Sequence, residues 1–114
     1  MRNDKLSVQS MDFAVQIINL VKALKEKRES IISNQIGRSG TSIGANIREA
    51  FYAHGKADFV AKLHIALKEC SETEYWLELL IESGYDYDKT ILDRCVEVKR
   101  ILIASINTAK ENIK

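Results

Sequence analysis

Residues 34–50 read NQIGRSGTSIGANIREA, and they combine an apolar repeat with an unusual number of glycines. Ile36, Ile43 and Ile47 recur at the spacing of one face of an α-helix. Three glycines fall inside the same segment, and each costs a helix up to about 1 kcal/mol relative to alanine. The segment therefore predicts a helix whose glycines serve close packing; they are Gly37, Gly40 and Gly44.

Gly40 and Gly44 form a small-xxx-small pair, which lets two helix backbones approach closely. Three interpretations remain open: a tight crossing inside one bundle, a contact between subunits, and the close approach of a ligand. Beside the glycines runs a second stripe of mostly small polar side chains, which predicts a hydrogen-bonded seam within the bundle or between subunits, with a plain solvent face as the alternative. This polar stripe comprises Gln35, Ser39, Ser42, Asn46 and Glu49.

Apolar residues at helical spacing continue on both sides of this segment, and the sequence contains no proline to interrupt them. They predict helices over about residues 7–27, 30–53, 57–83 and 88–112. We expect Ser7 or Ser10 to cap the first helix and Asp86 or Asp88 to cap the fourth, while Ser83 and Gly84 end the third. Short connections favour antiparallel neighbours, so the prediction is all-α: one domain, 1–114, forming an antiparallel up-down-up-down four-helix bundle.

A charged pair follows from the same hairpin geometry. If the second and third helices turn near residue 55, facing residues have numbers that add to about 111 or 112. Arg38 then lies level with Glu74. Glu74 interrupts an apolar stripe, and a partly buried carboxylate needs a partner of opposite charge. The sequence therefore predicts a buried Arg38–Glu74 ion pair.

Charge is nearly balanced over the whole chain but uneven along it. The formal net charge is +1, which gives no global signal for nucleic acid. Residues 1–57 hold nine Lys and Arg against five Asp and Glu, a net +4, and residues 58–114 hold eight against eleven, a net −3. Basic residues of the first half are candidates for nucleic-acid contact, although a solvated helix end explains them in a monomer; they are Lys22, Lys25, Lys27, Arg28 and Arg48.

The sequence has no recognisable set of catalytic or metal-binding residues. Bundle di-metal sites use Glu-x-x-His pairs, which are absent, and the two cysteines and two histidines lack zinc-finger spacing. The glycines sit within a helical pattern, unlike those of nucleotide-binding loops. Cys70 and Cys95 fall on apolar stripes, as reduced core cysteines do. We therefore expect no enzymatic activity, cofactor, metal or small-molecule substrate, and no apolar run reaches membrane-spanning length, so we expect a cytoplasmic protein.

Residues 35–80 resemble the four-helix-bundle family of 23S rRNA intervening-sequence proteins. The resemblance rests on QIGRSGTSIGANIREA, followed by ADF, by KLHIALKE and by ETEYWLELL in the third helix. It covers about 40% of the chain, and the flanking helices agree in length and order. Gly55 departs from relatives that often have a serine to cap the third helix.

The resemblance implies a bacterial cytoplasmic bundle that assembles as a homopentamer and has no established enzymatic activity. The family name also suggests an association with RNA or a ribonucleoprotein. A similar bundle is the accessory variability protein of diversity-generating retroelements, which implies an alternative role as a nucleic-acid-binding accessory subunit of a reverse transcriptase-type complex. That relative is strongly basic, and this chain is not. Our first hypothesis is an oligomeric, non-catalytic scaffold, and an unrecognised small enzyme is the third.

Overall fold

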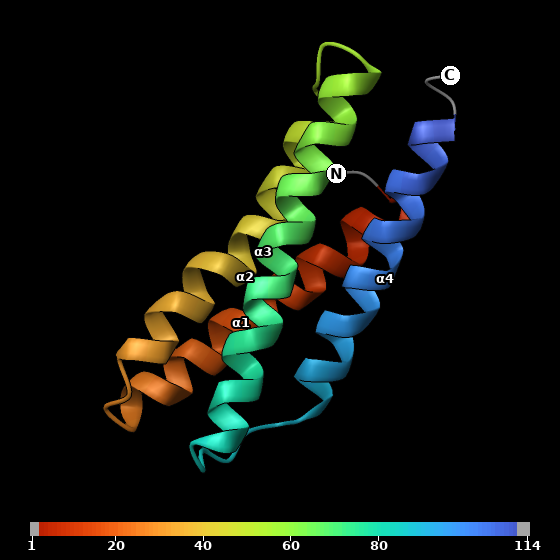
Figure 1. Ribbon diagram of the computed structural model, residues 1–114. Coiled ribbons are helices and arrows are strands. Elements are labelled where there is room, and N and C mark those ends of the chain that lie inside the picture. Colours follow the sequence, from red (N-terminus) through yellow and green to blue (C-terminus); the bar gives the residue numbers. More distant parts are fainter. Residues whose placement is uncertain (1–2, 112–114) are drawn as a thin grey trace.

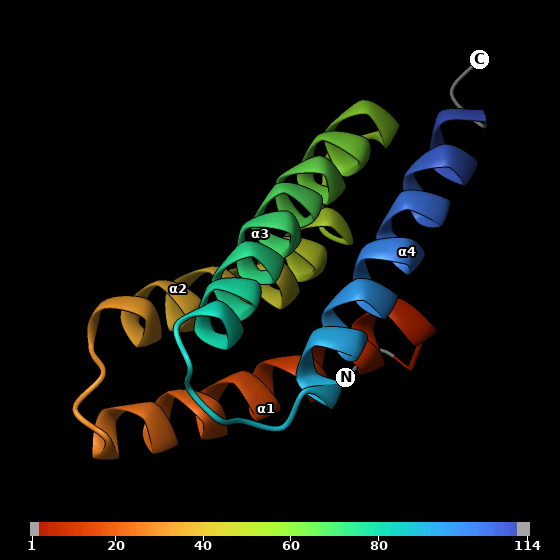
Figure 2. The same ribbon diagram turned by 60° about the horizontal axis from the view of Figure 1, so that its bottom comes forward.

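The computed structural model describes residues 3–111, most of which lie in four α-helices (Figure 1). These are α1 (Lys5–Glu26), α2 (Ile31–Ala50), α3 (Lys56–Glu82) and α4 (Thr90–Glu111). Each helix packs on the next along the chain, and α4 returns to contact α1. The predicted all-α, up-down-up-down four-helix bundle is confirmed. Figure 2 shows the α3–α4 connection passing beside α1.

The core consists of the apolar stripes that the sequence predicts. In α1, for example, Phe13 and Ile17 are at most 1% exposed, which places that face against the other helices. The apolar repeat predicted for α4 runs from Ile91 to Ile113 and is buried as far as Ile106. Ala109 is only partly buried, and Ile113 lies outside the described residues. The largest fully buried side chains come from all four helices, so one core joins them: Phe13, Ile17, Leu24, Ile36, Ile43, Ile47, Leu63, Leu77, Leu80, Leu102, Val98 and Thr73.

The caps at the starts of α1 and α4 can be compared with the expected ones. The cap of α1 is Asp4, whose carboxylate accepts a hydrogen bond from the backbone N–H of Ser7 at 3.0 Å, so the prediction of a serine cap was wrong. Ser10 is buried one turn further in. The expectation for α4 is confirmed for Asp88, which accepts hydrogen bonds from the backbone and hydroxyl of Thr90. A carboxylate suits a helix start because it satisfies N–H groups that have no helical partner.

The α2–α3 connection is longer than predicted, because α2 ends at Ala50 rather than near residue 53. Phe51 begins the turn, and its ring packs edge to face on Phe59 of α3 with 5.7 Å between centroids. Gly55, which lies in the predicted turn, therefore precedes α3 as its N-cap. At the other end of α3, Gly84 adopts a φ of 85° after Ser83, as expected for a glycine that ends a helix.

Candidate subunit-contact surface

Helices α1 and α2 approach most closely where Gly40 faces Ile17. A Cβ atom on Gly40 would lie 2.9 Å from both Cγ atoms of Ile17, whose side chain is fully buried. The corresponding space is larger at Gly37, 3.5 Å from Val21 Cγ2, and at Gly44, 3.6 Å from Ser10 Oγ. Among the three interpretations of the glycines, the structure thus shows a tight crossing inside the bundle at Gly40.

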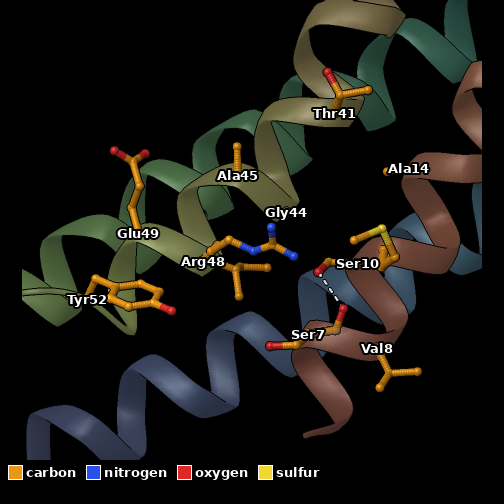
Figure 3. Close-up of a pocket in the computed structure, with 12 residues that line it drawn as sticks. Ser7, Val8, Ser10, Ala14, Thr41, Gly44, Ala45, Arg48, Glu49 and Tyr52 are labelled. Atoms are coloured by element: carbon orange, nitrogen blue, oxygen red, sulfur yellow. Dashed lines mark hydrogen bonds between the residues drawn. The ribbon is translucent and has the colours of Figure 1, made fainter. Parts of the chain in front are cut away.

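From Gly44 toward the start of α1, an open groove of about 920 Å³ lies between α1 and α2 (Figure 3). Small side chains on α2 leave this space, since Gly44 and Ala45 present little volume toward α1. The groove is mainly apolar, with a hydroxyl or charged group at intervals. Its lining comprises Ser7, Val8, Ser10, Met11, Ala14, Thr41, Gly44, Ala45, Ile47, Arg48, Glu49 and Tyr52.

Two α2-side residues give the groove its polar and aromatic character. The guanidinium of Arg48 reaches from α2 toward Ser10 on α1 (Figure 3). It forms no ion pair with any carboxylate in residues 3–111. Tyr52 follows the end of α2 and is 83% exposed, which is unusual for a large aromatic side chain. Arg and Tyr are both enriched at protein interfaces, so this end of the groove has the composition of a contact surface.

Helix α1 carries an exposed apolar stripe along the same face, which the sequence analysis missed. Its members are spaced three, four and three residues apart and are 39–52% exposed: Val8, Met11, Val15 and Ile18. Val8 and Met11 also line the groove. The signal in the sequence was a second helical repeat beside the buried one. When a helix is apolar on two sides, its own bundle buries one side, and a partner is needed to bury the other.

Within one chain, the polar stripe of α2 does not form a single hydrogen-bonded seam. Ser39 is fully buried, and its hydroxyl lies 2.8 Å from that of Thr73 on α3. Ser42 and Asn46 are half-buried, and each donates to the backbone carbonyl one turn earlier in α2. Gln35 and Glu49 are exposed. Within the described chain, the predicted helix-to-helix bonding therefore applies to Ser39 alone.

The predicted Arg38–Glu74 ion pair was wrong, although the register behind it was right. Ser39 and Thr73, whose numbers add to 112, do meet. Arg38 instead pairs with Glu69, at 3.1 Å, and with Glu72 on the outer side of α3. The prediction placed Glu74 at the correct level along α3 but on the wrong side of the helix. Glu74 follows Glu72 by two residues, and two residues of an α-helix rotate the side-chain direction by about 200°.

Glu74 is directed to the opposite side and belongs to a different helix pair. Its carboxylate binds the ammonium of Lys99 on α4 at 2.5 Å, and this hydrogen bond raises the pKa of Lys99. Glu72 accepts a hydrogen bond from the indole N–H of Trp76, which together with Arg38 lowers the pKa of Glu72. Acidic residues of α3 thus form ion pairs with both neighbouring helices. Glu69 and Glu72 pair with α2, and Glu74 pairs with α4.

The five candidate nucleic-acid contacts separate into two groups. Lys22, Lys25, Lys27 and Arg28 are all exposed where α1 ends. Arg48 lies at the far end of α2, 17 residues from its first residue, which corresponds to about 25 Å of helix. The structure therefore brings four of the five together and assigns the fifth to the groove.

Cys70 and Cys95 face each other across α3 and α4, and both are free and buried. Their sulfur atoms are 3.9 Å apart, and the hydrogen bond between them together with burial raises the pKa of Cys95. Within residues 3–111, no three His, Cys, Asp or Glu side chains gather as metal ligands. None of the helices in this part of the chain is both long and apolar enough to cross a membrane.

Comparisons with known proteins agree with this bundle. Residues 2–104 match the model of the family described as 23S rRNA-intervening sequence protein. The chain belongs to this family. A similar solved structure is that of a Bacteroides thetaiotaomicron protein of unknown function from the S23 ribosomal protein family. It shares 50% sequence identity with a TM-score of 0.85, and the match covers 89% of this chain and 97% of that one.

The family assignment confirms the resemblance inferred from helices two and three. No functionally curated protein shows significant similarity to this 23S rRNA-intervening sequence protein. The match to the family model extends well beyond residues 35–80, so α1 and most of α4 also carry the family pattern. The exposed groove described above lies within the matched residues.

Proposed function

We propose that this 23S rRNA-intervening sequence protein is a non-catalytic scaffold that assembles with copies of itself through the α1–α2 groove. The observation that carries the proposal is the exposed apolar stripe of α1, which runs beside the groove on one face. Exposed apolar surface is costly in water, and a contiguous strip of it marks a contact site. We expect a second copy of the chain to occupy the groove, because it is always present at the concentration of the protein itself.

The dimensions of this face suit a helix-mediated contact. From Ser7 to Ile18, α1 presents about 17 Å of surface, or three helical turns. A standard interface removes about 800 Å² from each partner, which is roughly 12% of the 6863 Å² accessible surface of the chain. The groove, the α1 stripe and Tyr52 together form one continuous region for such a contact.

Arg48 supports a contact of defined orientation rather than nonspecific apolar association. Its guanidinium has no carboxylate partner within residues 3–111, and a neighbouring subunit would supply one. Carboxylates are plentiful on α3, where Glu78 and Glu82 are exposed. Such a pair fixes orientation more than it adds affinity. The family resemblance implies five copies per assembly.

Light scattering behind size exclusion tests the proposal. The wild-type mass is expected to be a multiple of 12.9 kDa, and five chains is the number that the resemblance implies. Met11→Lys places a charge in the groove and is expected to reduce the mass to that of smaller species, because a buried charge without a partner costs several kcal/mol.

Val96→Lys is the matched control, because Val96 on α4 is 40% exposed and Met11 is 39% exposed. It is expected to retain the wild-type mass. A monomeric wild-type protein overturns the scaffold, and an unchanged Met11→Lys assembly overturns the assignment of the groove. Circular dichroism confirms that both variants remain helical.

A second candidate, nucleic-acid binding as an accessory subunit, is favoured by the basic turn. We define this basic turn as Lys22, Lys25, Lys27 and Arg28, all exposed at the end of α1. Their charges add up when several subunits bring the turns together. The printed family description refers to 23S rRNA, which makes RNA the ligand to test first.

Fluorescence anisotropy with single-stranded RNA at several salt concentrations checks this candidate. Each phosphate contact contributes about −0.7 to the slope of log K against log salt. Replacing Lys27 and Arg28 by Gln is expected to flatten that slope, whereas Arg100→Gln with Lys110→Gln, in the middle and the last turn of α4, is not. Binding that does not respond to salt argues against the basic turn.

A further inference from the structure

A second pocket, of about 330 Å³, lies between α1, the first turn of α4 and the α3–α4 connection. Figure 2 shows this connection passing close to α1 before α4 begins. The volume is at the lower end of the range for small-molecule sites. Four apolar residues line it, namely Leu20, Ala23, Leu24 and Ile91, and the polar members come from α1 and the connection.

Gln16 supplies an acceptor that the protein leaves unused. Its side-chain carbonyl oxygen is buried and accepts no hydrogen bond from residues 3–111. A buried carbonyl without a donor costs about 1–3 kcal/mol. A ligand that brings an N–H group into the pocket would remove this cost, so Gln16 favours a hydrogen-bond donor as part of the ligand.

Opposite charges line the pocket without neutralising each other. Lys27 comes from the residue that follows α1, and Asp86 comes from the connection. Neither forms an ion pair with any residue in the described part of the chain. Asp88 is different, because its hydrogen bonds to Thr90 hold its pKa below the usual value and commit it to capping α4.

We propose that this pocket binds a free α-amino acid with a branched apolar side chain, such as leucine. The ammonium group donates to Asp86 and to the carbonyl of Gln16, and the carboxylate binds Lys27. The side chain rests on the apolar floor formed by Leu20, Leu24 and Ile91. The pairing uses both unpaired charges of the pocket and the unsatisfied oxygen of Gln16, and it is independent of the scaffold proposed above.

Isothermal titration of the full chain with three related probes tests the proposal. L-leucine carries both charges, 3-methylbutylamine lacks the carboxylate, and 4-methylpentanoate lacks the ammonium group. Leucine is expected to bind at least about tenfold more tightly than either analogue, since each lost ion pair removes on the order of 1.4 kcal/mol. No heat of binding up to about 10 mM leucine overturns the site.

Variants separate this site from nonspecific binding. Asp86→Asn, Lys27→Met and Gln16→Leu are each expected to weaken leucine binding about tenfold or more. Asp93→Asn and Lys110→Met change exposed charges that do not line the pocket and are expected to leave the affinity unchanged. An amine that binds as tightly as leucine overturns the zwitterion assignment, and so does full affinity in Asp86→Asn.

Discussion

Gly40 illustrates at the scale of one residue how a local cost is offset by packing. Alanine is the better helix former by up to about 1 kcal/mol, but its methyl group at this position would overlap Ile17, whose side chain is fully buried. The glycine therefore sets the distance between α1 and α2, and through it the opening of the groove.

Gly40→Ala and Gly37→Ala are expected to change stability in opposite directions. Gly40→Ala is expected to destabilise the fold by about 1–2 kcal/mol, because overpacking outweighs the gain in helix propensity. Gly37→Ala is expected to stabilise it by about 0.5 kcal/mol, because its Cβ would make an ordinary contact 3.5 Å from Val21. Urea titration of both variants measures the difference, and equal effects would contradict the clash at Ile17.

Glu29 holds the start of α2 from a buried position. It is 7% exposed, and its carboxylate accepts hydrogen bonds from the backbone N–H groups of Ile32 and Ser33 at 2.8 and 2.7 Å. Ser30, which precedes the helix, makes no side-chain cap. The side chain of Glu29, one residue before Ser30, therefore caps the start of α2.

Removal of this carboxylate is expected to destabilise the bundle. Glu29→Ala leaves two N–H groups without a partner and is expected to cost about 1–2 kcal/mol. Glu26→Ala, at an exposed position in the last turn of α1, is the control and is expected to cost less than about 0.5 kcal/mol. The two free energies of unfolding are compared by urea denaturation. Equal losses would assign no special role to the buried cap.

At the scale of elements, Tyr87 ties the α3–α4 connection to the end of α3. Its hydroxyl donates to the carbonyl of Leu77 at 2.9 Å. Burial, with smaller contributions from Cys95 and Glu78, raises the pKa of Tyr87 to about 12. The folded state thus holds this proton more tightly than the unfolded chain, whose tyrosines titrate near pH 10.

This shift predicts a loss of stability at alkaline pH. The contribution of Tyr87 is fully present below about pH 10 and declines as the pH rises toward 12, because the unfolded chain loses its proton first. Tyr87→Phe is expected to lose about 1 kcal/mol at neutral pH and to show a flatter decline between pH 10 and 11.5. Tyr52→Phe, at an 83% exposed position, is expected to follow the wild type. Parallel curves for all three proteins would contradict the prediction.

At the scale of the whole molecule, the four helices share one core but do not all touch. In the described chain, the backbones of the diagonal pairs α1–α3 and α2–α4 do not approach each other closely, and the shared core joins all four helices. Charge is also divided, since the half that carries α1 and α2 is positive and the other is negative. This division leaves the α1–α2 face available for a partner of opposite charge.

Self-assembly predicts that stability depends on protein concentration. If folded chains associate, the urea midpoint is expected to rise as the chain concentration increases, because association removes folded monomers from the unfolding equilibrium. Met11→Lys is expected to abolish this dependence. Fluorescence of Trp76, the single tryptophan, and circular dichroism are followed together. A wild-type midpoint that does not change over a hundredfold range of concentration would argue against assembly.

The sequence by itself determined the fold class, the four helices and the buried face of each. Apolar spacing suffices for these because a helix must bury its apolar side, and short connections leave antiparallel neighbours as the way to do so. Glycines within a helix also indicated close packing before any contact was known. Ser39 and Thr73 show that even the register of α2 against α3 followed from the position of the turn.

Only the tertiary structure decided which side chains meet. Glu74 and Glu72 differ by two positions, yet one faces Lys99 and the other faces Arg38, because each residue turns about 100° around the helix. The groove depends on how α1 packs against the small residues of α2 beyond Gly40, and the second pocket on the course of the connection past α1. Crossing angles and loop paths depend on the packing of the whole core, so local spacing does not contain them.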